Sequence, residues 1–236
     1  MAELPPMPET WPEQRTYIGK LQHIGCDRLI QDILKDVPAG ASGTPFHFTI
    51  ARIVEKLMEE NHILGLRDDT TIPQIAWAFR NAIELQIFAR FVLKSETNVQ
   101  RFNNDFLING QSALRASLEL LNSFSKKVPN PMRPTGEQYR TVEEIRQARI
   151  QAGMGEEGPL MARTCAGSVG LQDHYDAVTT LTSMLIHPTT FSILKTFNFE
   201  VYRDQLNGQG LVGVGDAIVD IRKHIEKHGF RPESKK

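Results

Sequence analysis

Apolar side chains recur at steps of three and four residues along most of this chain, which is the period of an amphipathic α-helix. The pattern predicts helices over residues 12–37, 45–61, 72–94, 98–125, 137–153, 171–186 and 215–228. A further short helix is expected at 189–198, and only the stretch 198–203, NFEVYR, resembles a strand. The pattern therefore predicts an all-α fold, a single helical bundle of about seven to nine helices.

Proline and glycine set the expected borders of this bundle. Residues 1–11 are Pro-rich and are expected to be flexible, whereas 230–236 form a polar C-terminal tail. Between them, 12–229 is interpreted as one α-helical domain. Inside it, the stretch 126–136 contains three prolines in quick succession and is predicted to be a loop.

The most apolar of the predicted helices, 72–94, carries a pair of opposite charges. One stripe of this helix reads Trp77, Arg80, Glu84, Phe88 and Phe91. A helix that is apolar around most of its circumference is buried, so we expect 72–94 to be the most buried element. Buried charges are costly unless they are paired. Arg80 and Glu84 are therefore predicted to pair with each other or with polar groups of the 171–187 helix. Replacing Glu84 would cost about 3–5 kcal/mol if Arg80 were left buried and unpaired.

The helix at 171–187 offers the partners for this pair. Its polar stripe reads Asp176, Thr180, Ser183 and His187, and Tyr175 stands on its apolar side. His187 precedes a proline, which ends the helix, and its ring is expected to reach toward the charged pair. The candidate site residues are therefore Arg80, Glu84, Tyr175, Ser183 and His187.

Two interpretations of these five candidate residues remain open. A buried polar network can fix the register of helices. Alternatively, a His and a Glu in one dry site would have displaced pKa values suited to proton transfer. A hydrolase triad of Ser183, His187 and Glu84 is the bolder form. It lacks a nucleophile elbow and would take both Ser and His from one helix.

The spacing of these residues resembles a family of helical bacterial proteins whose function is uncharacterised. The resemblance rests on Arg80-x-x-x-Glu84, on Tyr175, and on SMLIHPTT from Ser183 to Thr190. It covers roughly residues 70 to 195. The resemblance implies a helical bundle and a bacterial source, and it supplies no activity.

A second resemblance involves the last predicted helix. Arg222 and His228 bracket five residues, which is similar to the Arg-x(4–6)-His motif of HEPN-like helical ribonucleases. In that family the Arg and His handle the scissile phosphate and its proton transfers, usually across a dimer. The resemblance implies a metal-independent ribonuclease of a toxin or phage-defence type. A solvated basic helix face is the competing interpretation.

Two further motifs match known sites only in part. Gly208-x-Gly210-x-x-Gly213 has the letters of a dinucleotide fingerprint but no preceding strand, so we interpret it as a flexible loop before the last helix. Glu59-x-x-His62 has the spacing of helical di-iron sites, which need two such motifs and two further glutamates. Neither motif predicts a cofactor or a metal, and we expect none.

Composition narrows the class of protein further. The formal net charge is −1, so no broad basic surface predicts DNA binding. Cys26 and Cys165 form no C-x-x-C pair and are expected to be small buried side chains. Without an apolar run or a signal-like N-terminus, we expect a cytoplasmic protein that does not bind membranes.

The function expected from sequence is thus an interaction or regulatory role. The buried polar network of Arg, Glu, Ser and His would be structural, and a protein partner or a second copy of the chain would bind an exposed surface. The alternative is the HEPN-like ribonuclease, and RNA is expected as a partner only in that case.

Overall fold

The fold is helical throughout the part of the chain that the structure describes. The computed structural model describes residues 10–36, 43–65, 70–125, 136–151, 159–186 and 200–233. Within these ranges the chain forms eight helices and no strand, and 90% of the residues are helical. The predicted all-α bundle is therefore confirmed.

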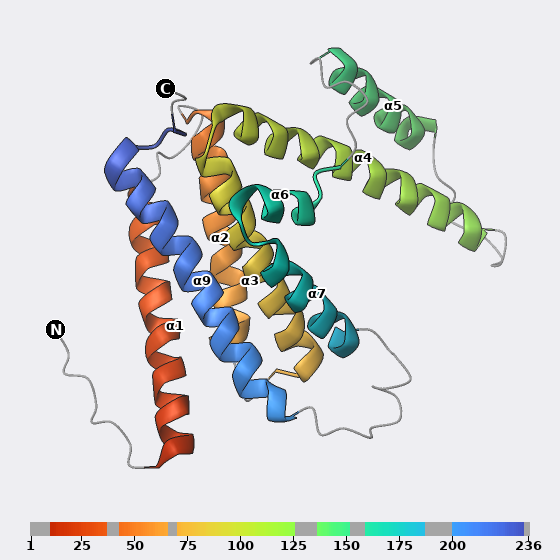
Figure 1. The fold of residues 1–236 in the computed structure, drawn as a ribbon. Coiled ribbons are helices and arrows are strands. Elements are labelled where there is room, and N and C mark those ends of the chain that lie inside the picture. Colours follow the sequence, from red (N-terminus) through yellow and green to blue (C-terminus); the bar gives the residue numbers. More distant parts are fainter. Residues whose placement is uncertain are drawn as a thin grey trace. The chain divides into compact units, whose positions relative to one another are not determined.

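The helix positions follow the apolar period closely (Figure 1). The helices are α1 (Trp11–Asp36), α2 (Pro45–Gly65), α3 (Ile72–Leu93), α4 (Glu96–Ser125), α5 (Gly136–Gln151), α6 (Ala162–Val169), α7 (Gln172–Ile186) and α9 (Glu200–His228). The helix expected at 189–198 and residues 126–135 of the loop expected at 126–136 lie outside the described residues. The last residue of that predicted loop, Gly136, is the first residue of α5.

The chain divides into two compact units. Unit 1 comprises 1–99 and 162–236, and unit 2 comprises 100–161. Unit 1 is therefore discontinuous in sequence, with unit 2 inserted between its two parts. The single domain expected over 12–229 stays a prediction, and each unit is described by itself.

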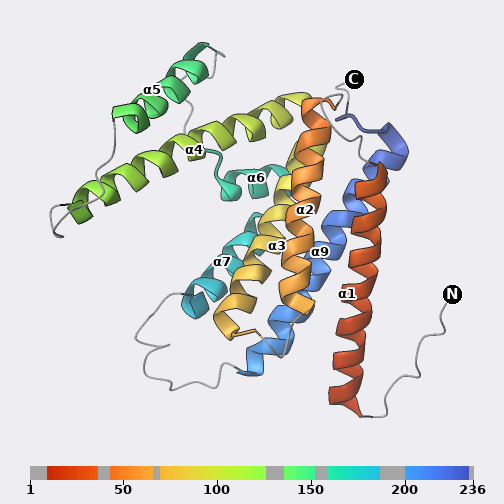
Figure 2. The ribbon, with the colours of Figure 1, turned by 180° about the vertical axis from the view of Figure 1, so that it is seen from behind.

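Helix α3 lies at the centre of unit 1 and contacts α2, α6, α7 and α9. Two polar pairs join it to α9: Gln86 Nε2 lies 3.2 Å from Asp216 Oδ2, and Arg90 Nε lies 2.6 Å from Asp220 Oδ2. Both pairs are separated by 130 residues, so α3 and α9 run parallel, side by side (Figures 1 and 2). Both helices consequently end at the same end of the unit.

A capping box at its N-terminus begins α3, and burial of its side chains stabilises the rest of the helix. Thr71 is the N-cap: its side chain accepts a hydrogen bond from the Gln74 N–H, and Gln74 Oε1 accepts one from the Thr71 N–H in return. Of the 22 residues of α3, 13 are buried, against nine of 21 in α2. The prediction that α3 is the most buried element is confirmed. Its apolar stripe is not buried throughout, because Trp77 is 49% exposed.

Helix α9 corrects three sequence predictions. It begins at Glu200, so residues 200–203 are helical rather than extended, and the helix starts well before the predicted 215. The Gly208–Gly213 segment lies inside this helix and is not a flexible loop. The dinucleotide fingerprint therefore has no phosphate-binding turn here.

The glycines of α9 allow its close approach to neighbouring helices. A Cβ added at Gly210 would lie 2.8 Å from Leu64 Cδ1 of α2, and one added at Gly213 would lie 2.7 Å from Ile83 Cδ1 of α3. Such distances are too short for carbon atoms in contact. Close packing thus offsets the low helix propensity of glycine, which had indicated a break.

One carboxylate is buried between α2 and α3. Glu60 is 2% exposed, and its Oε1 accepts a hydrogen bond from Asn81 Nδ2 at 2.9 Å. Its Oε2 is buried without a hydrogen-bond partner among the described residues. Burial raises the pKa of Glu60, against the opposing effects of Asn81 and Lys56.

Glu60→Gln is expected to stabilise the folded chain at neutral pH, by about 1 kcal/mol. Because the pKa of Glu60 is raised in the folded state, the folded protein binds more protons than the unfolded protein at pH values above about 4.3. The free energy of unfolding of the wild type therefore falls as the pH rises from about 4.3 through the raised pKa. Glutamine keeps the acceptor for Asn81 and removes the charge. Chemical unfolding at pH 4 and pH 7 measures the effect, which should be near zero at pH 4. Glu59→Gln, at an exposed neighbour, is the control, and a destabilised Glu60→Gln at pH 7 would contradict the buried charge.

The two thiols behave as expected from sequence. Cys26 and Cys165 are both buried, and neither forms a disulfide with a described residue. Burial, with the nearby charge of Asp27, raises the pKa of Cys26 to about 11, so the thiol stays protonated and unreactive.

Across the described ranges, none of the helices is both long and apolar enough to cross a membrane.

Unit 2 contains most of α4 together with α5. Helix α5 is charged and solvated, as predicted, and its ion pair between Arg140 and Glu144 is exposed. Asn122 of α4 donates a hydrogen bond to the Tyr139 hydroxyl of α5. The backbone N–H of Leu160 donates to the Asp105 carboxylate and ties the end of the unit to α4.

Candidate functional site

The structure brings together three of the five predicted site residues. Arg80 Nε donates to Glu84 Oε1 at 2.9 Å along α3, so the predicted ion pair is confirmed. Burial alone would lower the pKa of Arg80, but Glu84 and, more weakly, Tyr175 of α7 raise it above its ordinary value. The Tyr175 hydroxyl therefore lies within hydrogen-bonding reach of Arg80, as the pairing of the two helices predicted.

The other two residues are not joined to this pair. Ser183 is half-buried on α7 and makes no side-chain hydrogen bond among the described residues. His187 lies outside the described residues, and with it the expected contact to Glu84. The catalytic interpretation of the five residues, the hydrolase triad included, stays a prediction.

The ion pair is less buried than expected. The Arg80 and Glu84 side chains are 23% and 25% exposed, and the guanidinium carbon lies 6.0 Å from the ring centre of Trp77, which faces solvent. Solvent screening at this exposure reduces the worth of the pair.

Glu84→Gln is therefore expected to destabilise unit 1 by roughly 1 kcal/mol, less than the 3–5 kcal/mol of a fully buried pair. Thermal or chemical unfolding measures the change. The matched control is Glu226→Gln, which removes the i,i+4 partner of Arg222 on the exposed face of α9 and should change stability by less than about 0.5 kcal/mol. Equal effects of the two substitutions would remove any special role of the α3 pair.

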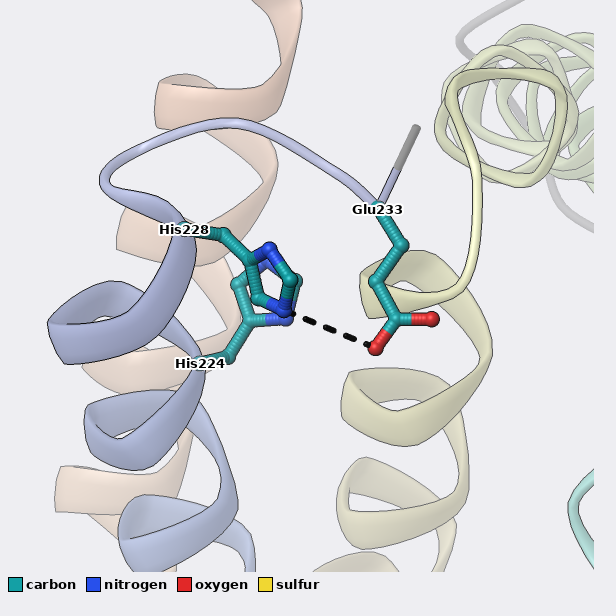
Figure 3. Close-up of side chains that lie close together, drawn as sticks. All are labelled: His224, His228 and Glu233. Atoms are coloured by element: carbon teal, nitrogen blue, oxygen red, sulfur yellow. Dashed lines mark ion pairs between the residues drawn. The ribbon is translucent and has the colours of Figure 1, made fainter. Parts of the chain in front are cut away.

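A second cluster lies at the C-terminal end of α9 and was not predicted. His224 and His228 are one turn apart, so both rings face the same side of the helix. Gly229 ends the helix with φ +69°, and its N–H donates to Ile225 O at 2.8 Å. The chain then reverses and brings Glu233 back toward both rings (Figure 3).

Hydrogen bonds hold the reversed segment in place. The Glu233 N–H donates to Leu93 O at the end of α3 at 3.1 Å, and Arg231 Nε donates to His228 O at 2.8 Å. The backbone that carries Glu233 is thus fixed to both parallel helices.

The three side chains place their ligand atoms close together. One ring nitrogen from each of His224 and His228 and one carboxylate oxygen of Glu233 all lie within 4.8 Å of one another. His228 Nε2 lies 3.9 Å from Glu233 Oε1 and is buried without a hydrogen-bond partner among the described residues. An unsatisfied buried nitrogen is costly unless something binds it.

His224 is oriented by the backbone. Its Nε2 lies 2.7 Å from Arg231 O, and because a carbonyl oxygen only accepts, this nitrogen carries the proton. Nδ1 is then the nitrogen with a free lone pair. Burial lowers the pKa of His224, and His228 and Lys227 lower it further against the opposing effect of the Arg231 carbonyl. A neutral, oriented imidazole is the form that binds metal ions.

The surroundings of the cluster carry strong charge of both signs. A cavity of about 330 Å³ opens beside the cluster. Its wall carries four cationic side chains and two carboxylates: Arg90, Lys94, Lys223, Lys227, Asp220 and Glu233. Because α3 and α9 run parallel, the negative ends of both helix dipoles also point here, which favours a bound cation.

The remaining sequence motifs do not form this site. Arg222 pairs with Glu226 at 3.0 Å and does not line the cavity, whereas His228 does. Glu59 pairs with Lys56 and lines a different cavity together with His62. Within the described residues, His224, His228 and Glu233 are the one group of three such ligands.

A sequence signal for the cluster was present. His-x-x-x-His on an amphipathic helix places two imidazoles on one face, whereas the resemblance to HEPN-like ribonucleases pairs His228 with Arg222. Glu233 had no signal, because its position depends on the chain reversal at Gly229. No protein-family model, curated protein or solved structure matches this chain.

Proposed function

We propose that this chain binds a divalent transition-metal ion, Zn²⁺ in the first place, between His224, His228 and Glu233. The observation that carries the proposal is the convergence of three ligand atoms within 4.8 Å. Two imidazoles and a carboxylate are a known ligand set for open zinc sites. The backbone hydrogen bond of His224 is the outer support that such ligands have.

The ligands must close up slightly around an ion. Tetrahedral bonds of about 2.0 Å place ligand atoms about 3.3 Å apart, whereas His228 Nε2 and Glu233 Oε1 are 3.9 Å apart. The Glu233 side chain is 53% exposed and has three rotatable bonds, so it can move without disturbing packed groups. The His224 ring is held by the Arg231 carbonyl, so the Glu233 and His228 side chains make most of the adjustment.

Three protein ligands leave one position of a tetrahedral ion open. In proteins, closed four-ligand sites are structural, and sites with an open position bind water or substrate. The cavity beside the cluster gives that position room for a ligand. The proposed role is therefore an open, reactive metal site rather than a structural one.

Titration with Co²⁺ and Zn²⁺ tests the proposal. We expect one ion per chain, visible d–d absorption of tetrahedral intensity for Co²⁺, and its loss when Zn²⁺ displaces the cobalt. Affinity should fall at acidic pH, because a protonated imidazole has no free lone pair. His62→Gln, at an exposed histidine outside the cluster, is the control and should bind both ions normally. A chain that binds neither ion at micromolar concentrations would contradict the proposal.

A ribonuclease is the second candidate function. It is favoured by two imidazoles beside Lys223 and Lys227 in one cavity, a set suited to proton transfer and phosphate binding. Chelation separates the two candidates, since RNA cleavage by imidazoles alone would survive EDTA. The interaction or regulatory role expected from sequence, with a structural polar network and a partner on an exposed surface, stays a prediction.

A further inference from the structure

Two lysines beside the proposed metal cluster form no ion pair with another described residue. Lys223 and Lys227 are exposed, one turn apart on α9, and each precedes one of the two histidines. Like charges at this spacing repel and destabilise a helix. No carboxylate among the described residues pairs with either lysine. By contrast, Arg222 on the same helix is paired with Glu226.

The other charges of the cavity are already engaged. Arg90 is bound to Asp220 at 2.6 Å, and Lys94 donates to the backbone carbonyl of Ser168. Glu233 is a proposed metal ligand. The two lysines are thus the cations left available to a ligand beside the open coordination position.

We expect an anion to bind here far more tightly when the metal is present. The ends of α3 and α9 make the empty site unfavourable for a negative group. A divalent ion reverses this, because it is then the largest charge in the site. Lysine ammonium groups bind phosphate oxygens well, and a phosphate oxygen is also a good ligand for Zn²⁺.

We infer that the site binds a terminal phosphate group, with one oxygen on the open position of the metal ion and others on Lys223 and Lys227. The inference rests on the proposed metal site. The cavity is open to solvent, so a terminal phosphate can enter it. A phosphate monoester has three terminal oxygens, enough for the metal ion and both lysines, and more negative charge than a phosphodiester, which has only two such oxygens.

The test uses the full chain loaded with one equivalent of Co²⁺, whose unpaired electrons broaden the ³¹P NMR line of a bound phosphate. Methyl phosphate should be broadened by the Co²⁺-loaded protein, and the Zn²⁺-loaded protein, which is diamagnetic, sets the unbroadened line width. No broadening by the Co²⁺-loaded wild type overturns the inference. The double variant Lys223→Gln, Lys227→Gln should bind Co²⁺ as the wild type does, and methyl phosphate at least about tenfold more weakly. Arg222→Gln removes one positive charge from the same helix, outside the cavity. This control variant should bind Co²⁺ and methyl phosphate as the wild type does.

The outcomes separate the two proposals. Failure to bind Co²⁺ overturns the metal site and the phosphate inference with it. Normal Co²⁺ binding, with methyl phosphate bound equally by the wild type and the lysine variant, overturns the phosphate inference alone. Dimethyl phosphate bound as tightly as methyl phosphate would also overturn it, and would favour a phosphodiester such as RNA.

Discussion

His228→Gln is expected to lower the affinity for Zn²⁺ by at least about a hundredfold. Losing an outer-shell partner of a metal ligand already costs 10- to 100-fold, and this substitution removes a ligand. Glutamine is similar in length and polar, so it can occupy the same place at the end of α9. Competition with a chromophoric chelator measures the affinity of both proteins.

Fold integrity and ligand identity are controlled separately. The melting temperature of the metal-free His228→Gln protein should be close to that of the metal-free wild type. The ring nitrogen that points at Glu233 has no hydrogen-bond partner to lose among the described residues, and its 3.9 Å contact with Glu233 is an ion pair only when the ring is protonated. Zn²⁺ should raise the melting temperature of the wild type only. If Glu233→Gln retained full affinity while His228→Gln lost it, the carboxylate would have to be removed from the ligand set.

Phe79→Ala is expected to destabilise unit 1 by about 3–5 kcal/mol. Phe79 is 1% exposed and lies on α3, which contacts four other helices, so its removal leaves a cavity that cannot easily collapse. Because a domain of this size is stable by only about 5–15 kcal/mol, much of the folded population would be lost on mild heating. Denaturant unfolding followed by circular dichroism measures the change.

The control lies two residues away on the same helix. Trp77 is a larger aromatic residue but is 49% exposed. Trp77→Ala should therefore cost well under half as much as Phe79→Ala. Similar costs for the two substitutions would mean that α3 is covered on the face where the structure leaves it open.

Local pattern was sufficient to predict most helices but not their neighbours. The period of apolar residues placed α3 correctly, and its wide apolar surface correctly indicated burial. Which side of α3 stays exposed depends on how many helices surround it. The exposure of Trp77 could therefore not be derived from the apolar pattern. In α9, the prediction followed the low helix propensity of glycine and placed a loop there. The close contacts at Gly210 and Gly213 that favour a helix involve residues more than a hundred positions away, so the local pattern does not show them.

The two clusters differ in how far they could be predicted from sequence, because one depends on the geometry of a single helix and the other on a reversal of the chain. Arg80 and Glu84 are four residues apart on one helix, so their pairing follows from helix geometry. Tyr175 could be added because both helices are strongly patterned. The third ligand of the metal cluster depends on one residue, Gly229, in the left-handed region, and on a backbone hydrogen bond to Leu93. Neither is visible in the spacing of side chains.

The discontinuity of unit 1 has a consequence for protein synthesis. Residues 94–199 separate α3 from α9, and at 5–20 residues per second the ribosome needs roughly 5–20 s to make them. During that time the first three helices exist without the one that packs along α3 over its length. Nascent chains of this protein should therefore expose an apolar surface until α9 emerges, and a general chaperone that binds such surfaces would act on them in that interval.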